Sequence, residues 1–160
     1  MSDRFTKIQT LDGEDLVISK QRVTDYGEVL TGEREVKAML DLVKQETERI
    51  DSRFLEPACG TGNFLTEVLK RKLAAVKSRY RKSQLEYERN AVLAISSIYG
   101  IDILQDNVVK CRERLFSIFE KAYRRLFHAT SKNECCNAVN YILEKNIVHG
   151  DALTMKSVGD

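Results

Sequence analysis

The sequence contains 160 residues, which is about one domain and long enough to bury a single hydrophobic core. Lys and Arg number 26 and Asp and Glu 24, so the formal net charge of +2 is too small to indicate nucleic-acid binding by itself. No apolar run approaches the roughly 18–20 residues of a transmembrane helix, and the start M-S-D-R-F-T-K has no apolar signal core. The sequence therefore predicts a cytoplasmic protein.

The N-terminal third predicts little regular structure before one helix. Phe5 to Arg22 alternates weakly in polarity around the turn signal Asp12-Gly13, which favours an irregular arm or a poor hairpin. After Thr31-Gly32, apolar residues recur at helical spacing and acidic residues stand in the first turn. This pattern predicts a helix from Glu33 to Glu48.

Short apolar segments and longer amphipathic segments then alternate. Arg53 to Glu56 predicts a buried strand that ends at Pro57. A helical stripe follows at Leu65, Val68, Leu69, Leu73, Val76 and Tyr80. The basic residues between these positions predict a solvated face, made of Lys70, Arg71, Lys72, Lys77 and Arg79.

The second half continues the alternation. A helical pattern that starts near Tyr87 is predicted to stop at Gly100, before a short strand at Ile101-Asp102-Ile103. Two further helices are predicted at 108–126 and 133–145, and I-V-H-G-D-A is a third short strand that ends at Gly150-Asp151. Alternating strands and helices are typical of a parallel sheet with crossover helices, so the predicted fold class is α/β.

The stretch E-P-A-C-G-T-G-N-F, from Glu56 to Phe64, predicts a ligand-binding turn. Glycines at 60 and 62 let the backbone approach a ligand closely, and the following helix offers unpaired N–H groups. Leu65 stands where a dinucleotide fingerprint has its third glycine, and no Lys-Ser or Lys-Thr pair follows as in a P-loop. Dinucleotide and triphosphate sites are therefore disfavoured.

The glycine loop ends the first predicted strand, Asp102 ends the second and Asp151 ends the third. Ligands of open parallel sheets bind beyond the carboxyl ends of the strands. There Asp102 is suited to accept hydrogen bonds from ribose hydroxyls, and Asp151 from an adenine amino group. Ile103 can cover an adenine face, and Glu56 can balance a cationic ligand. An aspartate after a strand is also a common turn former or helix cap.

No metal site is predicted. The four cysteines are Cys59, Cys111, Cys135 and Cys136, and none of their spacings resembles C-x-x-C. They are interpreted as reduced, buried thiols. The two histidines, His128 and His149, have no ligand partners nearby in the sequence and are interpreted as structural.

These motifs carry a resemblance. E-P-A-C-G-T-G-N-F-L resembles the cofactor-binding motif of class I S-adenosylmethionine-dependent methyltransferases, in particular the DNA adenine-N6 methyltransferases of restriction-modification systems. Y-G-E-V-L-T-G-E-R-E-V-K-A-M-L-D-L, G-I-D-I and G-D-A-L resemble three further segments of that family in the same order. The resemblance spans Tyr26 to Leu153, and it departs from the family at Gly32, where proline is usual.

The resemblance implies a cofactor, S-adenosyl-L-methionine, and a division of labour. Thr31 and the loop Glu56 to Phe64 would hold its methionine end, Asp102 its ribose, and Asp151 its adenine. The full implied set is Thr31, Glu56, Pro57, Ala58, Cys59, Gly60, Thr61, Gly62, Asn63, Phe64, Asp102, Ile103, Asp151 and Ala152. The implied fold is a partial Rossmann-like class I methyltransferase fold preceded by an N-terminal helical segment. Residues 1–25 would form an arm and 26–160 the N-terminal part of the cofactor-binding domain.

The catalytic element of that family is not recognisable. Family members use an Asn-Pro-Pro-Tyr or Asp-Pro-Pro-Tyr element that holds the target adenine, whereas the only proline here is Pro57. No catalytic residue is assigned, and this chain alone is expected to be inactive. DNA is the implied partner of the complete enzyme, and an exposed sheet edge is expected to bind a complementing polypeptide or a second copy.

Other readings remain open at the level of sequence. The substrate can be RNA, protein or a small molecule, because the fold does not fix the function. A non-catalytic assembly module that keeps a remnant cofactor loop is a second alternative. The basic stretch Lys70 to Lys82 is interpreted as a solvated helix face rather than a nucleic-acid contact.

Overall fold

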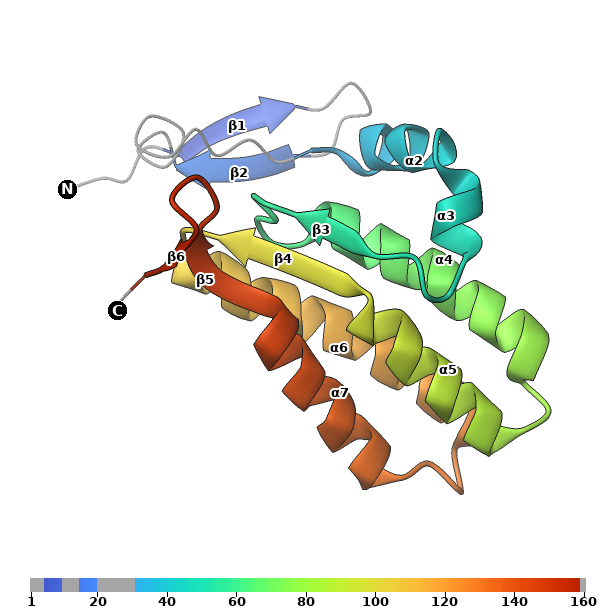
Figure 1. Cartoon of the computed structure of the whole chain (residues 1–160). Coiled ribbons are helices and arrows are strands. Elements are labelled where there is room, and N and C mark those ends of the chain that lie inside the picture. Colours follow the sequence, from blue (N-terminus) through green and yellow to red (C-terminus); the bar gives the residue numbers. More distant parts are fainter. Residues whose placement is uncertain (1–4, 10–14, 20–30, 159–160) are drawn as a thin grey trace.

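The computed structural model describes residues 5–9, 15–19 and 31–158 of the chain. Within these residues the predicted α/β class is confirmed: six helices accompany a four-stranded sheet and a separate two-stranded sheet (Figure 1). Strands β1 (Phe5–Gln9) and β2 (Asp15–Ser19) pair antiparallel, so the hairpin alternative at the N-terminus is confirmed. The predicted turn at Asp12-Gly13 lies outside the described residues.

The main sheet has the order β3-β4-β5-β6. Its strands are β3 (Phe54–Glu56), β4 (Ile98–Asp102), β5 (Ile147–Asp151) and β6 (Lys156–Ser157). The first three strands are parallel, as predicted, and β6 returns antiparallel to β5. Strand β3 lies at one edge of this sheet, which is the exposed edge that the sequence predicts.

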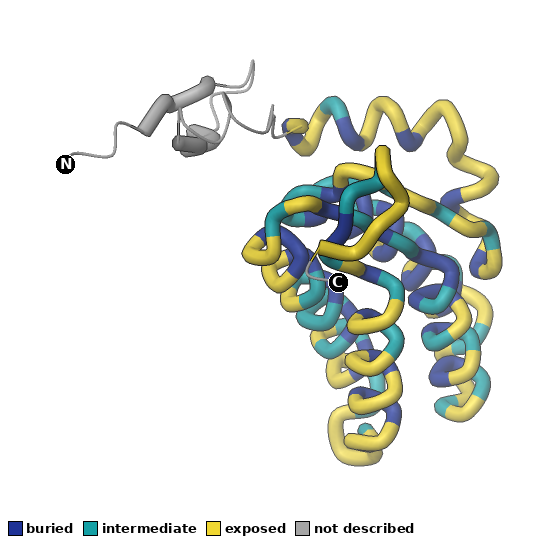
Figure 2. Tube along the Cα trace, turned by 60° about the vertical axis from the view of Figure 1, so that its left-hand side comes forward, coloured by how far each residue is buried: buried dark blue, intermediate teal, exposed yellow. Residues whose placement is uncertain are grey.

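Four long helices pack together on one side of the sheet (Figure 1). They are α4 (Asn63–Tyr80), α5 (Gln84–Ser96), α6 (Gln105–Phe127) and α7 (Asn133–Asn146). Each begins or ends within two or three residues of its predicted limits, because its apolar stripe recurs with the helical period. Figure 2 shows the inner surfaces of these helices buried and their outer surfaces exposed. No helix among the described residues is long and apolar enough to cross a membrane.

The core lies between these helices and the sheet face that they cover. Ile98, Gly100 and Ile147 point to this face and are buried. The opposite face is open, since Leu55 is 61% and Val148 37% exposed. The prediction that the first strand is buried is therefore wrong for β3, which is at the edge of the sheet and is covered on one face only.

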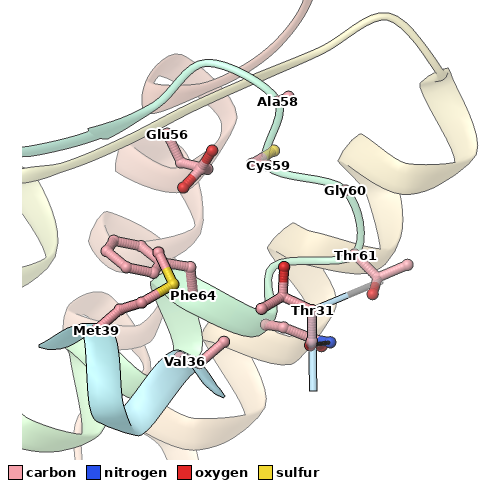
Figure 3. A pocket seen from close by; sticks show the side chains of 10 residues that line it. Thr31, Val36, Met39, Glu56, Ala58, Cys59, Gly60, Thr61 and Phe64 are labelled. Atoms are coloured by element: carbon pink, nitrogen blue, oxygen red, sulfur yellow. Dashed lines mark hydrogen bonds between the residues drawn. The ribbon is translucent and has the colours of Figure 1, made fainter. Parts of the chain in front are cut away.

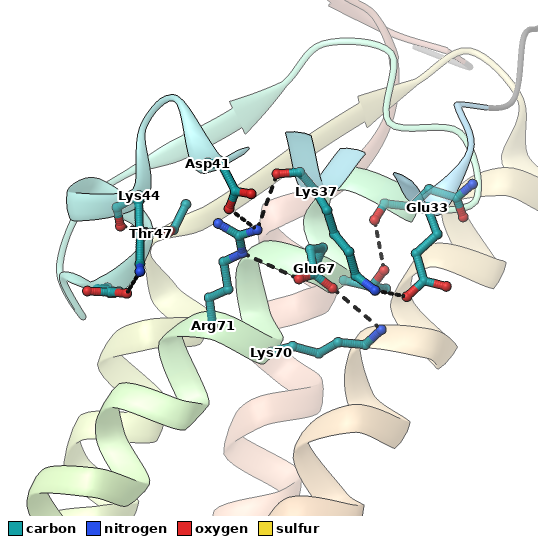
Figure 4. A network of polar contacts seen from close by, with 11 residues as sticks. Glu33, Lys37, Asp41, Lys44, Thr47, Glu67, Lys70 and Arg71 are labelled. Carbon is teal, nitrogen blue, oxygen red and sulfur yellow. Dashed lines mark hydrogen bonds and ion pairs between the residues drawn. The ribbon is translucent and has the colours of Figure 1, made fainter. Parts of the chain in front are cut away.

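The predicted helix from Glu33 to Glu48 is two helices, α2 (Glu33–Asp41) and α3 (Lys44–Glu48), with a turn at Leu42 and Val43. Because the chain turns there, α3 also packs against α4. Arg71 of α4 contacts α2 through an ion pair of 2.8 Å to Asp41 and a hydrogen bond of 3.3 Å to the Lys37 carbonyl (Figure 4).

One basic residue of the predicted solvated face is buried. Lys72 has no exposed surface, and its Nζ donates to the carbonyl oxygens of Arg49, Ile50 and Ser52 and to Ser97 Oγ, at 2.6–3.0 Å. Burial lowers the pKa of Lys72 to about 8. The ammonium group thus joins α4 to the segment before β3 and to the start of β4, where the sequence predicts a charge in solvent.

Gly100 has a different role from the predicted one. It does not stop a helix; it lies in the middle of β4, and α5 ends before it at Ser96. A Cβ atom at Gly100 would approach Leu65 Cδ1 to 2.9 Å and Cys59 Sγ to 3.0 Å. Glycine is therefore required there because α4 and the glycine loop cross the strand at close range.

Candidate functional site

The loop between β3 and α4 has the conformation that its glycines predict. Gly60 and Gly62 have positive φ angles of 52° and 87°, and Gly62 is the N-cap residue of α4. A Cβ atom at Gly62 would lie 2.6 Å from Cys111 Sγ, whereas one at Gly60 would meet no atom within 4 Å. Gly62 therefore packs the loop against α6, and Gly60 leaves open space above the loop.

Backbone and side-chain hydrogen bonds hold the loop to the end of β4. The Cys59 N–H donates to the Ile101 carbonyl at 2.9 Å, and the Gly60 N–H donates to Asp102 Oδ2 at 2.8 Å. Asp102 is 8% exposed, and its Oδ1 accepts from the Leu104 N–H at 2.9 Å and from Asn107 Nδ2 at 3.2 Å. Asp102 is thus part of the scaffold that shapes the loop, a role that sequence reasoning did not assign to it.

A cavity of about 170 Å³ lies between this loop and α2 (Figure 3). It brings together most of the predicted loop residues with Thr31. Its lining consists of Thr31, Val36, Met39, Glu56, Ala58, Cys59, Gly60, Thr61, Asn63 and Phe64. In Figure 3 the Glu56 carboxylate points into this space from the end of β3, with Met39 and Phe64 beside it and Thr31 across from it.

The described lining of the cavity has one acidic group, Glu56, and one thiol, Cys59. Burial raises the pKa of Glu56, although a hydrogen bond from the Ala58 N–H opposes the shift. The Cys111 thiol and burial raise the pKa of Cys59 above its ordinary value, which disfavours its thiolate form. The electrostatic character of the cavity therefore comes from Glu56, which suits a ligand with a positive group.

The remaining predicted residues lie outside the lining of this cavity. Ile103 follows β4 and is 46% exposed, and its carbonyl oxygen is 3.0 Å from His149 Nε2. Asp151 ends β5, where its carboxylate accepts from the Leu153 N–H at 2.8 Å and from Thr154 Oγ1 at 3.0 Å. The Leu153 N–H lowers the pKa of Asp151. Ala152 is the next residue of this turn, whose side-chain hydrogen bonds join residues no more than three positions apart.

Three residues of the site were not predicted from sequence. Val36 and Met39 line the cavity from α2, although their spacing had indicated only a helix core. Arg114 of α6 donates to the loop at Thr61 and Asn63. No local pattern marks Arg114, because its partners are more than 50 residues away in the sequence.

The thiols and histidines form no metal site among residues 31–158. No group of three or more His, Cys, Asp or Glu side chains gathers there in a way that could hold an ion. Cys135 and Cys136 are buried and free, in agreement with their interpretation as reduced thiols.

Comparison with models of known protein families gives a match over most of the chain. A family model for the DNA-methyltransferase domain of MmeI matches residues 30–157, which include the glycine loop, all three parallel strands and both aspartates. Comparison with curated proteins gives no match, and comparison with solved structures gives none. The matched range covers most of the chain and agrees with the predicted span from Tyr26 to Leu153. The chain thus belongs to the MmeI DNA-methyltransferase domain family, as a methyltransferase domain of the restriction-modification kind.

Proposed function

We propose that the chain binds S-adenosyl-L-methionine at the cavity beside the glycine loop, with the methionine end facing Glu56. The observation that carries this proposal is the position of the Glu56 carboxylate, which points into a cavity of about 170 Å³ bounded by a glycine loop and a helix N-terminus. Small-molecule sites for whole cofactors commonly measure roughly 300–1,000 Å³. A cavity of this volume suits one end of the cofactor rather than all of it.

The residues present fit the chemistry of that end. The cofactor carries an ammonium and a sulfonium group, and a carboxylate in a partly buried site attracts such groups strongly. The absence of any atom within 4 Å of the Cβ position of Gly60 gives a ligand access to the loop backbone. When bound, the cofactor supplies the methyl group that is transferred; the chain's residues bind and orient it.

Asp102 and Asp151 are proposed to hold the ribose and the adenine. Asp102 lies next to the loop, and its oxygens retain acceptor capacity beyond the three hydrogen bonds that they already accept. Asp151 stands at the end of the adjacent strand, with Ala152 beside it. Ile103 directly follows Asp102 at the end of β4 and exposes an apolar side chain that can cover a base.

The substrate is proposed to be DNA, methylated at the adenine amino group in the complete enzyme. Family membership favours DNA over RNA, protein or a small molecule, and the likeness of G-D-A-L and G-I-D-I to the adenine-N6 class favours adenine. We place this activity in the cytoplasm.

This chain alone is proposed to be inactive and to act as the N-terminal part, residues 26–160, of a methyltransferase domain, with residues 1–25 as an arm. Its single proline, Pro57, rules out a Pro-Pro element within the chain. The open face with Leu55 and Val148, and the edge position of β3, support completion of the sheet by a complementing polypeptide or by a second copy. Addition of either partner is expected to bury this face.

Calorimetric titration tests the cofactor proposal directly. The purified chain is titrated with S-adenosylmethionine and with its demethylated product, with NAD as a control ligand, and Asp102→Asn is measured beside the wild type. Saturable binding of the first two ligands, weakened in the variant, supports the site. A folded chain that binds neither would contradict it.

Transfer of a radiolabelled methyl group tests the proposed inactivity. The chain is incubated with labelled cofactor and adenine-containing DNA, and the label in the DNA is counted. Incorporation above the level of a control with DNA and labelled cofactor but without the chain would overturn the proposal that this chain lacks the catalytic element.

A further inference from the structure

Arg114 contacts the glycine loop from a different element. It is half-buried on α6, and its Nη1 donates to the Thr61 carbonyl at 2.7 Å, to Thr61 Oγ1 at 3.2 Å and to Asn63 Oδ1 at 2.7 Å. Both acceptor residues line the cavity beside Glu56. A guanidinium group is always charged and gives strong, directional hydrogen bonds, so these contacts fix the loop at Thr61 and Asn63, whereas Asp102 holds it at Gly60.

The Asn63 side chain that accepts from Arg114 also makes a hydrogen bond to the segment that precedes α2. Its Nδ2 donates to the Thr31 carbonyl at 2.9 Å. The orientation of the amide follows from chemistry, because Arg114 can only donate and the Thr31 carbonyl can only accept. Arg114 must therefore face Oδ1, which leaves Nδ2 for Thr31. Because Arg114 can only donate, it fixes Asn63 as the donor in the hydrogen bond between Asn63 and the Thr31 carbonyl.

Helix α6 supports the loop at two points of the same helical face. Cys111 and Arg114 are three residues apart, a spacing that places their side chains side by side. Cys111 Sγ would lie only 2.6 Å from a Cβ atom at Gly62, and Arg114 contacts the neighbouring residues Thr61 and Asn63. The loop therefore rests on α6 as well as on β4.

We propose that Arg114 is a positioning residue for the cofactor: it holds Thr61 and Asn63 and, through the Asn63 amide, keeps the Thr31 segment over the cavity. This inference rests on the proposed function of the cavity. Arg114 does not line the cavity in which Glu56 lies, so it acts through the residues that it orients. Its removal frees the Asn63 amide to turn and leaves the Thr31 carbonyl without a directed donor.

Arg112 provides a matched control on the same helix. It also donates to backbone carbonyl oxygens, to Ile147 by Nε at 2.9 Å and to Glu144 by Nη2 at 3.0 Å. These bonds join α6 to the junction of α7 and β5 and do not involve the glycine loop. Arg112→Ala therefore removes a similar number of hydrogen bonds and the same charge, at a place unrelated to the cavity.

The test compares Arg114→Ala, Arg114→Lys and Arg112→Ala with the wild type in calorimetric titrations with the demethylated cofactor product. Thermal unfolding of each variant identifies any that does not fold. Arg114→Ala is expected to bind at least about tenfold more weakly, and Arg112→Ala within about threefold of the wild type. Arg114→Lys should stay weak, because one ammonium group cannot reproduce the guanidinium geometry. Low millimolar guanidinium should restore part of the affinity of Arg114→Ala only.

A second measurement does not need the cofactor. Amide hydrogen exchange is followed in peptides that cover 31–36 and 59–66. Faster exchange in both regions is expected for Arg114→Ala and not for Arg112→Ala. The same result is expected for Asn63→Asp in 31–36, because a carboxylate there keeps the contact with Arg114 and loses the donor to Thr31.

The outcomes separate the two proposals. If the wild type binds and Arg114→Ala binds equally well, the role of Arg114 is overturned and the function stands. If a folded wild type binds neither S-adenosylmethionine nor its demethylated product, the function is overturned together with the cofactor role of Arg114. Unchanged exchange in Arg114→Ala would overturn the proposed link from α6 to Thr31 whatever the binding result.

Discussion

The parallel strands β4 and β5 each end in an aspartate at their carboxyl-terminal ends, and the two aspartates have different hydrogen-bond partners. Asp102 is buried and accepts from Gly60, which is 42 residues away in the sequence, as well as from the start of α6. Asp151 accepts only from its own turn in the hydrogen bonds of the described chain, at Leu153 and Thr154. An aspartate that ends a strand of this sheet can therefore support a distant loop or a local turn, according to what packs against it.

Removal of the Asp102 carboxylate is expected to have the largest effect. Asp102→Ala removes the acceptor of three hydrogen bonds, one of them buried and two partly buried, so the free energy of unfolding should fall by about 4 kcal/mol. Asp102→Asn should cost about half as much, since it keeps one acceptor oxygen and turns its amide toward at least one N–H. Chemical denaturation measures both changes. Equal stability of Asp102→Ala and the wild type would show that the long-range contacts are unimportant.

A methyl group at Gly62 tests the loop that Asp102 supports. Gly62→Ala combines a left-handed backbone with a Cβ atom 2.6 Å from Cys111 Sγ, so it should destabilise the fold by about 3 kcal/mol. Gly60→Ala meets no atom within 4 Å and should cost about 1 kcal/mol, from the backbone conformation alone. The pair is compared by denaturant unfolding. A smaller loss for Gly62→Ala than for Gly60→Ala would contradict the packing against α6.

The acid at the end of β3 gives a pH dependence. Burial raises the pKa of Glu56 above 4.5, so its carboxylate becomes protonated at a higher pH than an exposed glutamate does. Affinity for the cofactor should therefore decrease as the pH falls through this raised pKa. Glu56→Gln should bind about tenfold more weakly, or about 1.4 kcal/mol, and should lose the pH dependence.

Stability should respond to Glu56 with the opposite sign. A raised pKa in the folded state means that the folded chain binds more protons in this window, so the contribution to stability falls as the pH rises through the raised pKa. Titrations at several pH values, with the exposed Glu113→Gln as a control, measure the binding effect. A pH profile of Glu56→Gln that matches the wild type would exclude Glu56 as the origin.

The smallest effect on stability is expected at the end of β5. Asp151→Asn keeps an oxygen that can accept from the Leu153 N–H, so the turn should persist and the midpoint of thermal unfolding should move by less than about 2 °C. Cofactor binding should nevertheless weaken if Asp151 holds the adenine. A large loss of stability would mean that Asp151 resembles Asp102 after all.

The sequence predicted what depends on periodicity and local turn chemistry. The presence of α6 and α7 within three residues of their predicted limits, the three parallel strands and the turn conformation of the glycine loop are confirmed, because apolar spacing and glycine conformations are local properties. Family membership is likewise confirmed, by the family model that matches residues 30–157.

What failed depends on contacts between distant segments. Lys72 looks like a solvated residue until the carbonyl groups of 49–52 are brought to it, and Gly100 looks like a helix stop until the loop crosses it. The role of Arg114 could not be predicted for the same reason, because the residues that it contacts are 51 and 53 positions away in the sequence. The division of 33–48 into two helices reflects packing of α3 on α4, which the repeat of apolar residues does not encode.

The buried ammonium group of Lys72 also provides a chemical reporter. An amine-reactive reagent can reach it only when α4 separates from the segment before β3, whereas exposed lysines react at once. Mass spectrometry of Lys72 after brief labelling would therefore count the molecules whose interior has opened. The same measurement would compare variants of this domain, or its complexes with a partner, by the fraction of molecules in which Lys72 becomes accessible.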